Sequence, residues 1–428
     1  MLPKSPRLRR ILFAYTVNEL GTWFGYVALA LAVYDRTHSA IAIAGLFVAR
    51  GLLPALLAPV LVARTERSER RGGLAGLYLI EAALTVGLAA LLWRFWLPGV
   101  LALVTLDGIA AVAATALVRA AAARVAIEEA GGGVAAGTAP AQAAADTAQR
   151  QANASLNFSF MIMLAVGPAI GAALVHAVGG PTTLLLDAGT FIVCAALLVG
   201  VHTYVEEMIE SSVRARLAAA VRHISEVPQL RVLLITEAVA IVFFASVEPV
   251  EVIYARATLH AGALGYGLLL GIWGAGAALG AVVFARSVHR PLAPMLTGGT
   301  LLVGLAYLGF AAAPTLAIAC VAAAVGGVGN GIQWPSLISA VQQLTPGGLQ
   351  GRIMSAVGSM GALCPAIGFA LGGSLVAIGS PRIAMGVAGI VAALTTGVFL
   401  RLPLHGLRST RDAEMTLVPE PSLVTSVR

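Results

Sequence analysis

Lysine is almost absent from the sequence. Lys4 is the only lysine among 428 residues. A phosphate-binding loop of the form Gly-x-x-x-x-Gly-Lys-Ser/Thr is therefore impossible, which excludes ATP hydrolysis by that machinery. The same count excludes a retinal-type Schiff base inside a membrane.

Metal-binding and catalytic patterns are also missing. The three cysteines, Cys194, Cys320 and Cys364, have no spacing that suggests a metal site or a disulfide framework. The seven histidines are scattered, and neither His-Glu-x-x-His nor a nucleophile–base spacing occurs. We expect no enzymatic activity, no metal and no cofactor.

Charged residues are scarce and apolar residues abundant, at 11% and 59% of the chain, with a mean hydropathy of +0.90. A hydrocarbon core of about 30 Å is crossed by roughly 20 apolar residues in a helix, and such runs recur along the whole sequence. Each run is continuous rather than alternating in polarity, which favours helices over barrel strands. We predict an all-α membrane protein with twelve transmembrane helices, at residues 11–34, 40–63, 72–93, 98–118, 152–178, 182–204, 230–254, 264–285, 293–312, 315–340, 352–378 and 382–403.

Arginine is distributed unequally between the two sets of loops. Most arginines precede the first span, follow spans two, four, six and eight, or lie in the tail, whereas the opposite loops hold only Arg36, Arg94, Arg256 and Arg382. Cytoplasmic loops carry an excess of positive residues, so both termini are predicted to be cytoplasmic. The net charge of +7 then reflects topology and not nucleic-acid binding. The predicted location is the cell membrane, as a multi-pass protein, with a bacterial inner membrane favoured.

The chain divides into two similar halves. A polar segment at 205–229 separates a first bundle (1–204) from a second (230–403), followed by a cytoplasmic tail at 404–428 that we expect to be disordered. This segment has the pattern of either an amphipathic surface helix or a solvated linker. The stretch "GPAIGAAL" at 167–174 reappears as "CPAIGFAL" at 364–371, an offset of 197 residues, whereas "VAR" at 62–64 matches "FAR" at 284–286 with an offset of 222. We predict that an Ala/Gly-rich loop at 127–151, inside a cytoplasmic insertion at about 119–151, accounts for this difference. Duplicated six-helix units are typical of transporters with a midplane site.

Several motifs resemble those of the major facilitator superfamily. They are "GTWFGYVALALAVYDRTHSA" (21–40), "ARGLLPALLAP" (49–59), "LGYGLLLGIWGAGAALGA" (264–281) and "GRIMSAVGSMGALCPAIG" (351–368). Within the superfamily the chain is most similar to bacterial exporters of drugs, siderophores and macrolides. The resemblance covers nearly all twelve spans and implies two pseudo-symmetric six-helix bundles that export small molecules by alternating access.

The loop between spans two and three departs from the family pattern, with Glu66 in place of Asp and Val62 in place of Gly. By resemblance this loop forms a cytoplasmic gate. A carboxylate near the N-terminus of the eleventh span would be favoured by about 0.3–1 kcal/mol. The alternative is a plain topogenic charge cluster. The predicted gate residues are Glu66, Arg67, Arg70, Arg71, Arg119 and Arg352.

A hinge is predicted in span five at Gly167, Pro168 and Gly171. Proline removes a backbone donor and bends a helix, and glycines allow a neighbouring helix to approach closely. The element resembles one found in antiporters of the superfamily. Ordinary packing of small residues is the alternative.

Glu19 lies near the predicted midplane of the first span. A charged residue there costs about 2.5–3.5 kcal/mol on insertion scales and normally faces a cavity or a partner. Tyr15, Glu19, Thr22 and Tyr26 form one helical stripe. Arg50 in span two reaches a comparable depth, so two interpretations stay open: a static Glu19/Arg50 pair, or a carboxyl that exchanges protons.

Three further carboxyls, Glu81, Asp107 and Glu237, lie at depths that suit proton coupling. Glu237 shares a helical stripe with Phe244, Glu248 and Glu251. Polar and aromatic side chains predicted to line the same cavity are Asn18, Thr22, Trp23, Tyr26, Asn157, Phe158, Phe244, Asn330, Gln333 and Trp334.

These patterns predict a secondary active transporter, a proton-coupled antiporter that exports small amphiphilic molecules such as drugs, siderophores or other metabolites. Its expected partners are the small-molecule substrate, protons and the bilayer, with no nucleic acid, and the chain is expected to act as a monomer. The alternative is an uncoupled facilitator, or a metabolite or lipid transporter of the same fold.

Overall fold

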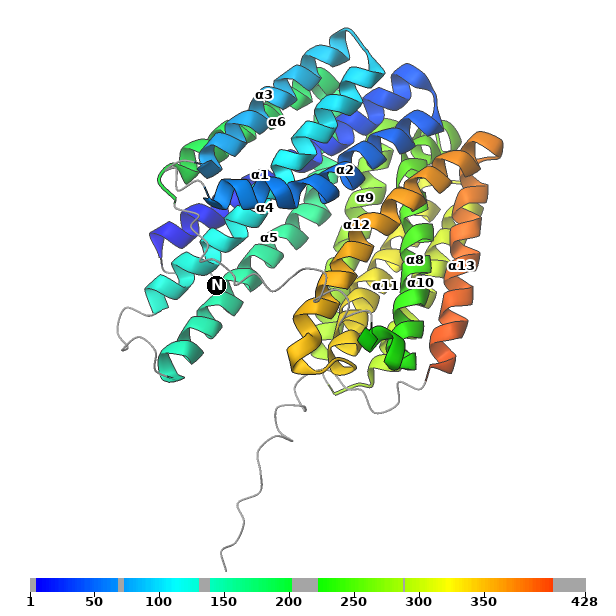
Figure 1. Cartoon of the computed structure of the whole chain (residues 1–428). Coiled ribbons are helices and arrows are strands. Elements are labelled where there is room, and N and C mark those ends of the chain that lie inside the picture. Colours follow the sequence, from blue (N-terminus) through cyan, green and yellow to red (C-terminus); the bar gives the residue numbers. More distant parts are fainter. Residues whose placement is uncertain (1–4, 68–72, 131–138, 202–221, 288, 403–428) are drawn as a thin grey trace, which may run out of the picture.

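The structure is a computed structural model that describes residues 5–67, 73–130, 139–201, 222–287 and 289–402. These residues form twelve long helices, which run in two groups side by side (Figure 1). The first group comprises α1 (Pro6–Thr37), α2 (Ala40–Arg67), α3 (Gly73–Trp93), α4 (Leu97–Ala130), α5 (Ala139–Val178) and α6 (Gly180–Leu198). The second comprises α8 (Pro228–Ile253), α9 (Gly262–Arg286), α10 (Leu292–Ala312), α11 (Leu316–Gln343), α12 (Gly347–Ile378) and α13 (Pro381–Arg401), with a π-helical turn, η1 (Tyr254–Thr258), after α8. The all-α prediction is confirmed.

Eleven of these helices are long and apolar enough to cross a membrane. The exception within the described ranges is α1. The polar side chains of Asn18 and Glu19 near its middle lower its hydropathy, and Arg9, Arg10 and Asp35 add charge toward its ends. A multi-pass membrane protein is therefore supported by the composition of the helices, while a twelfth span and the side on which the termini lie stay predictions.

The segment predicted as an Ala/Gly-rich loop at 127–151 is largely helical. α4 continues to Ala130 and α5 begins at Ala139. Alanine has the highest helix propensity of all residues, so this composition prolongs both helices instead of forming a loop. Residues 131–138 lie outside the described ranges, as do most of the predicted linker at 205–229 and the tail at 404–428.

Among the side chains that the structure describes, one buried apolar cluster joins the two halves, and it lies toward one end of the molecule. The largest cluster joins Val27–Val33 of α1 and Ala40–Phe47 of α2 to residues of α8, α9 and α10 in the other half. A second cluster, which includes Tyr15 and Leu117, belongs to the first half alone. A third, which includes Leu233 and Leu337, belongs to the second half alone. The two halves therefore pack against each other through a shared apolar core where α1 ends and α2 begins. Toward the opposite end each half has its own core.

Candidate functional site

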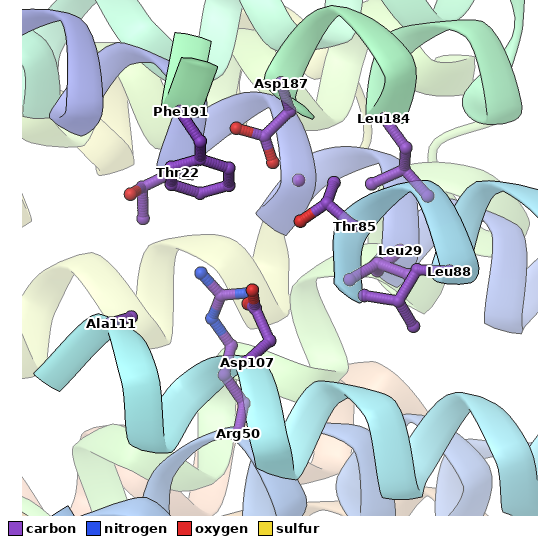
Figure 2. A pocket seen from close by; sticks show the side chains of 11 residues that line it. Thr22, Leu29, Arg50, Thr85, Leu88, Asp107, Ala111, Leu184, Asp187 and Phe191 are labelled. Carbon is purple, nitrogen blue, oxygen red and sulfur yellow. The ribbon is translucent and has the colours of Figure 1, made fainter. Parts of the chain in front are cut away.

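A buried polar pocket lies inside the first half. Its walls come from α1, α2, α3, α4 and α6, and none of its lining residues comes from α5 or from the second half (Figure 2). It is lined by Thr22, Gly25, Leu29, Arg50, Thr85, Leu88, Asp107, Ala111, Leu184, Asp187 and Phe191. The pocket leaves about 10 Å³ for the centre of a water molecule, which is roughly the space that one water needs. It suits water and protons rather than a drug-sized molecule.

The charged side chains of this pocket are unbalanced. In Figure 2 the Arg50 guanidinium points toward the Asp107 carboxyl, and Asp187 approaches the same space from α6. Glu81 of α3 interacts electrostatically with Asp107, Asp187 and Arg50. We call this pocket, together with the adjoining Glu81, the acidic pocket; its charged side chains are Arg50, Glu81, Asp107 and Asp187. The acidic pocket thus contains three carboxyls, each between 1% and 7% exposed, and one guanidinium, so the acidic groups outnumber the basic one.

Two oxygens of the acidic pocket lack a hydrogen-bond partner among the described residues: Glu81 Oε1 and Asp107 Oδ1. Buried polar atoms are nearly always satisfied in native proteins, and a lone carboxylate in an apolar interior is strongly disfavoured. Such oxygens are satisfied when a water or a proton enters the pocket. The part of the chain that the structure describes contains no group of His, Cys, Asp and Glu suited to a metal ion.

Asp187 belongs to this site although it was not among the residues predicted from the sequence. The Thr190 hydroxyl lies 3.4 Å from Asp187 Oδ1. On α1, a Cβ atom added to Gly25 would lie 2.5 Å from Asp187 Oδ2, and one added to Gly21 would lie 2.5 Å from Asp187 Oδ1. These glycines, four residues apart in "ELGTWFG", leave the space that the carboxyl needs. Their spacing was the available signal, but the partner helix could not be read from one chain segment.

Glu19 and Arg50 are not brought together. The structure describes no ion pair between them, and Arg50 instead lies over the Tyr26 ring, with its Cζ atom 5.8 Å from the ring centroid. Glu19 is 9% exposed and interacts with Tyr15 and Arg119. The residues of the predicted α1 stripe therefore do not share one site. Thr22 lines the acidic pocket, whereas Glu19 lies outside it, closer to the α1 N-terminus.

Arg119 connects Glu19 to α5. Its Nη2 donates to the Tyr15 hydroxyl at 2.9 Å and its Nη1 to Asn157 Oδ1 at 3.3 Å. The guanidinium also lies 5.5 Å from the centroid of the Tyr15 ring. Beside this group, Asn18 is buried and its Oδ1 has no described partner. Arg119, which was predicted as a gate residue, thus contacts α1 and α5 within the first half, and its role in a gate stays a prediction.

Glu237 occupies a closed site in the second half. It is 1% exposed on α8, and Gln333 of α11, equally buried, donates its Nε2 to both carboxylate oxygens at 2.9 Å. Of the other residues predicted for the cavity, Asn330 and Phe244 are partly buried, Trp334 is 41% exposed and Phe158 is 69% exposed. None of these residues lines the acidic pocket.

The predicted cytoplasmic gate lies mostly beyond what the structure describes. Arg70 and Arg71 fall in 68–72, and the side chains of Glu66 and Arg67 are likewise outside the described part. Arg352 is partly buried in the first turns of α12 and forms no ion pair with any described residue. The gate stays a prediction.

The predicted hinge lies at a contact between the halves. Pro168 is inside α5, and a Cβ atom on Gly167 would lie 2.4 Å from Trp23 Cδ1 of α1. On its other side α5 meets α9, where a Cβ atom on Gly267 would lie 2.7 Å from the Pro168 carbonyl oxygen. A Cβ atom on Gly274 would lie 2.4 Å from the Leu164 carbonyl oxygen. Two helices from different halves thus approach to backbone contact along glycines.

An ion pair between the halves was not predicted from the sequence. Arg256 in η1 donates from Nη2 to Asp35 at the end of α1. The side chains are 28% and 48% exposed. The pair lies at the end of the molecule where the apolar core joins the two halves. The ion pair and the shared core therefore hold the halves together at the same end.

Comparison with known proteins agrees with the predicted family. The sequence profile of the Major Facilitator Superfamily matches residues 233–426. The multidrug efflux pump Tap from Mycolicibacterium fortuitum is 29% identical over 225 residues, which cover 50% of this chain and 54% of the pump. The chain therefore matches about half the length of that relative.

Solved structures share the fold over almost the whole chain. The nucleoside transporter NupG (D323A mutant) has a TM-score of 0.70 at 11% identity and covers 92% of this chain and 99% of its own. A POT family transporter in complex with a thioalcohol conjugated peptide has a TM-score of 0.64 at 16% identity and covers 92% and 95%. At these identities the likeness concerns the fold alone. The sequence motifs, the profile match over the second half and the shared fold together support the predicted resemblance to transporters of the Major Facilitator Superfamily.

Proposed function

We propose that the chain is a proton-coupled antiporter that exports small amphiphilic molecules by alternating access, with both termini on the cytoplasmic side of a bacterial inner membrane. In this proposal the two six-helix halves rock against each other, and the acidic pocket exchanges the protons. Glu81 and Asp107 take the leading roles, Asp187 joins them, and Glu19 becomes a secondary candidate.

The observation that carries the proposal is the imbalance of the acidic pocket. Three buried carboxyls with one guanidinium can be neutral overall only if protons occupy two of them. Desolvation disfavours the ionised form of a carboxyl, and contact with water restores it. A change in hydration of this pocket during rocking would therefore bind or release protons. Because the pocket lies within one half, cargo can pass between the halves without crossing the proton site.

The direction of opening follows from the distribution of the core. The halves share a core around the end of α1 and the start of α2, and the Asp35–Arg256 ion pair closes the same end. At the opposite end each half has its own core. If the arginine-rich loops are cytoplasmic, this arrangement supports an inward-facing state that accepts cargo from the cytoplasm. The Tap relative supports export as the net direction.

The test is flux of ethidium and of the neutral dye Nile red in proteoliposomes with an imposed pH gradient. The wild type should move dye against its gradient, whereas Asp107→Asn should lose gradient-driven movement and keep dye exchange at equal pH. Glu128→Gln, which removes a carboxylate from an exposed ion pair at the end of α4, is the control. Dye flux in the wild type that ignores the pH gradient would favour the alternative, an uncoupled facilitator.

A further inference from the structure

Two carboxyls near the far end of α8 lie at the seam between the halves. Glu248 and Glu251 are one helical turn apart, on either side of Pro249, and the π-helical turn η1 begins three residues later. Glu248 interacts with Tyr26 of α1, and Tyr266 of α9 interacts with both carboxyls. We call Tyr26, Glu248, Glu251, Tyr266 and Tyr307 the seam cluster. One member comes from the first half and four from the second.

The seam cluster has no positive charge of its own. Among the described residues neither Glu248 nor Glu251 forms an ion pair. Arg50 lies over the Tyr26 ring, with its Cζ atom 5.8 Å from the ring centroid, and Arg256 pairs with Asp35. Buried carboxyls are normally paired with a positive charge. Glu248 and Glu251 are adjacent, partly buried and form no such pair with a described residue.

Aromatic rings enclose these carboxyls. Tyr26 contacts Trp23 with ring centroids 5.3 Å apart, and Phe47 at 5.2 Å. Tyr307 stacks on Trp273 at 5.6 Å and interacts with both Glu248 and Glu251. These rings hold one another in place, so the aromatic faces are preorganised.

One hydroxyl of the cluster is unsatisfied. Tyr266 is fully buried, and its hydroxyl has no hydrogen-bond partner in the described part of the chain. The same side chain interacts with Glu251, Glu248 and Tyr26, so its hydroxyl belongs to the seam cluster. A buried donor without an acceptor costs free energy, and a bound molecule can supply the missing partner.

We propose that the seam cluster is a binding subsite for the charged group of an organic cation. The inference rests on the proposed export function and names a substrate class for it. The carboxylates supply the opposite charge, and the faces of the tyrosine rings attract a weakly hydrated cation such as a quaternary ammonium or phosphonium group. An inorganic divalent ion is disfavoured, because it requires a larger set of oxygen ligands than two carboxyls provide.

The position of the subsite fits a role in transport. Tyr26 belongs to one half and the carboxyls to the other, so rocking of the halves changes the distance between them. The affinity for a cation should then differ between the two states of the carrier, and a difference in affinity is what allows cargo binding to drive a conformational change. Pro249 and η1 make the end of α8 locally irregular, which is common at functional sites in helices.

The test is equilibrium binding of radiolabelled tetraphenylphosphonium to the purified full chain in nanodiscs, without any gradient. The anion tetraphenylborate has the same shape and the opposite charge. We expect the wild type to bind the cation and not the anion, and the double variant Glu248→Gln/Glu251→Gln to bind the cation at least about tenfold more weakly, since it loses both charges that face the ligand. Glu128→Gln is the matched charge control, and Glu248→Asp should keep most of the binding.

Three results would overturn the inference: no cation binding by the wild type, equal binding of the anion, or unchanged cation binding by the double variant. Thermal melting of each variant in detergent checks that it is folded, and Tyr266→Phe provides a milder probe that removes only one hydroxyl. Because binding is measured without a pH gradient, its outcome is independent of proton coupling. A carrier that binds the cation but ignores the gradient would refute the proposed coupling alone.

Discussion

The two halves bury carboxyls in different ways. In the first half Glu81 and Asp107 each have an oxygen without a described partner beside a small pocket. In the second half both oxygens of Glu237 accept from Gln333. A satisfied buried carboxyl is explained by its own hydrogen bonds, whereas an unsatisfied one requires water, a proton or another occupant. The difference is consistent with the proposal that the two bundles have separate tasks, with proton exchange in the first and packing in the second.

The largest expected effect comes from neutralising the unsatisfied pair. In the double variant Glu81→Gln/Asp107→Asn, gradient-driven dye transport should be abolished while dye exchange persists, because the remaining carboxylate of Asp187 is balanced by Arg50 and needs no proton. The measurement is dye flux in proteoliposomes. In contrast, Glu237→Gln should retain transport, since the amide can still bond with Gln333. Equal loss in both variants would erase the distinction between the halves.

The next effect concerns the contact of α5 with α9. In Gly274→Ala the new methyl group would lie 2.4 Å from the Leu164 carbonyl oxygen, and overpacking of this kind costs about 1–3 kcal/mol. The thermal midpoint in detergent should fall. Gly298→Ala, also inside a helix, meets nothing within 4 Å and should be neutral or stabilising, because alanine favours helix. Similar midpoints in both variants would show that the glycines do not limit the approach of the halves.

A comparable loss of stability is expected when Glu237 is truncated. Glu237→Ala leaves the buried Gln333 amide without its acceptor, at a cost of about 1–3 kcal/mol. Glu237→Gln should cost less. Thermal melting of the two variants checks the order. If Glu237→Ala melted at the wild-type temperature, Gln333 would have other partners, and its hydrogen bonds to Glu237 would not be needed for stability.

The smallest effect is expected from the partly exposed Asp35–Arg256 ion pair. Ion pairs that water reaches contribute about 0.2–1 kcal/mol, so Asp35→Asn should shift the balance of states slightly toward opening at this end. Alkylation of a cysteine introduced at the start of α2, in a cysteine-free background, measures this opening. The charge-reversed pair Asp35→Arg/Arg256→Asp should restore the wild-type rate. Failure of the reversal would assign the effect to one side chain and not to the pair.

Helices and their order could be predicted from the sequence, because apolar runs of sufficient length have few alternatives in a membrane. Individual partners could not. Depth along a span placed Glu19 and Arg50 at a similar level, but depth says nothing about rotation or about which helices are neighbours. The packing of α1 against α6 through Gly21 and Gly25 brings Asp187 into the acidic pocket, and Arg119 takes the place beside Glu19.

The amino-acid composition was also misleading where it is compatible with both a loop and a helix. Alanine and glycine between 127 and 151 suggested a loop, but alanine also prolongs helices, and α4 and α5 use it in that way. The Asp35–Arg256 pair was hidden for a different reason. Its members are 221 residues apart, and only the meeting of two halves at one end brings them together.

The most direct test of the central claim is the number of protons that the purified chain releases when the pH of a weakly buffered solution is raised. A pH-sensitive dye records the release in the wild type, in Glu81→Gln/Asp107→Asn and in Glu237→Gln. The first-half variant should release fewer protons than the wild type, while the Glu237→Gln variant should match the wild type. Wild-type release from the first-half variant, together with reduced release from Glu237→Gln, would contradict the central claim.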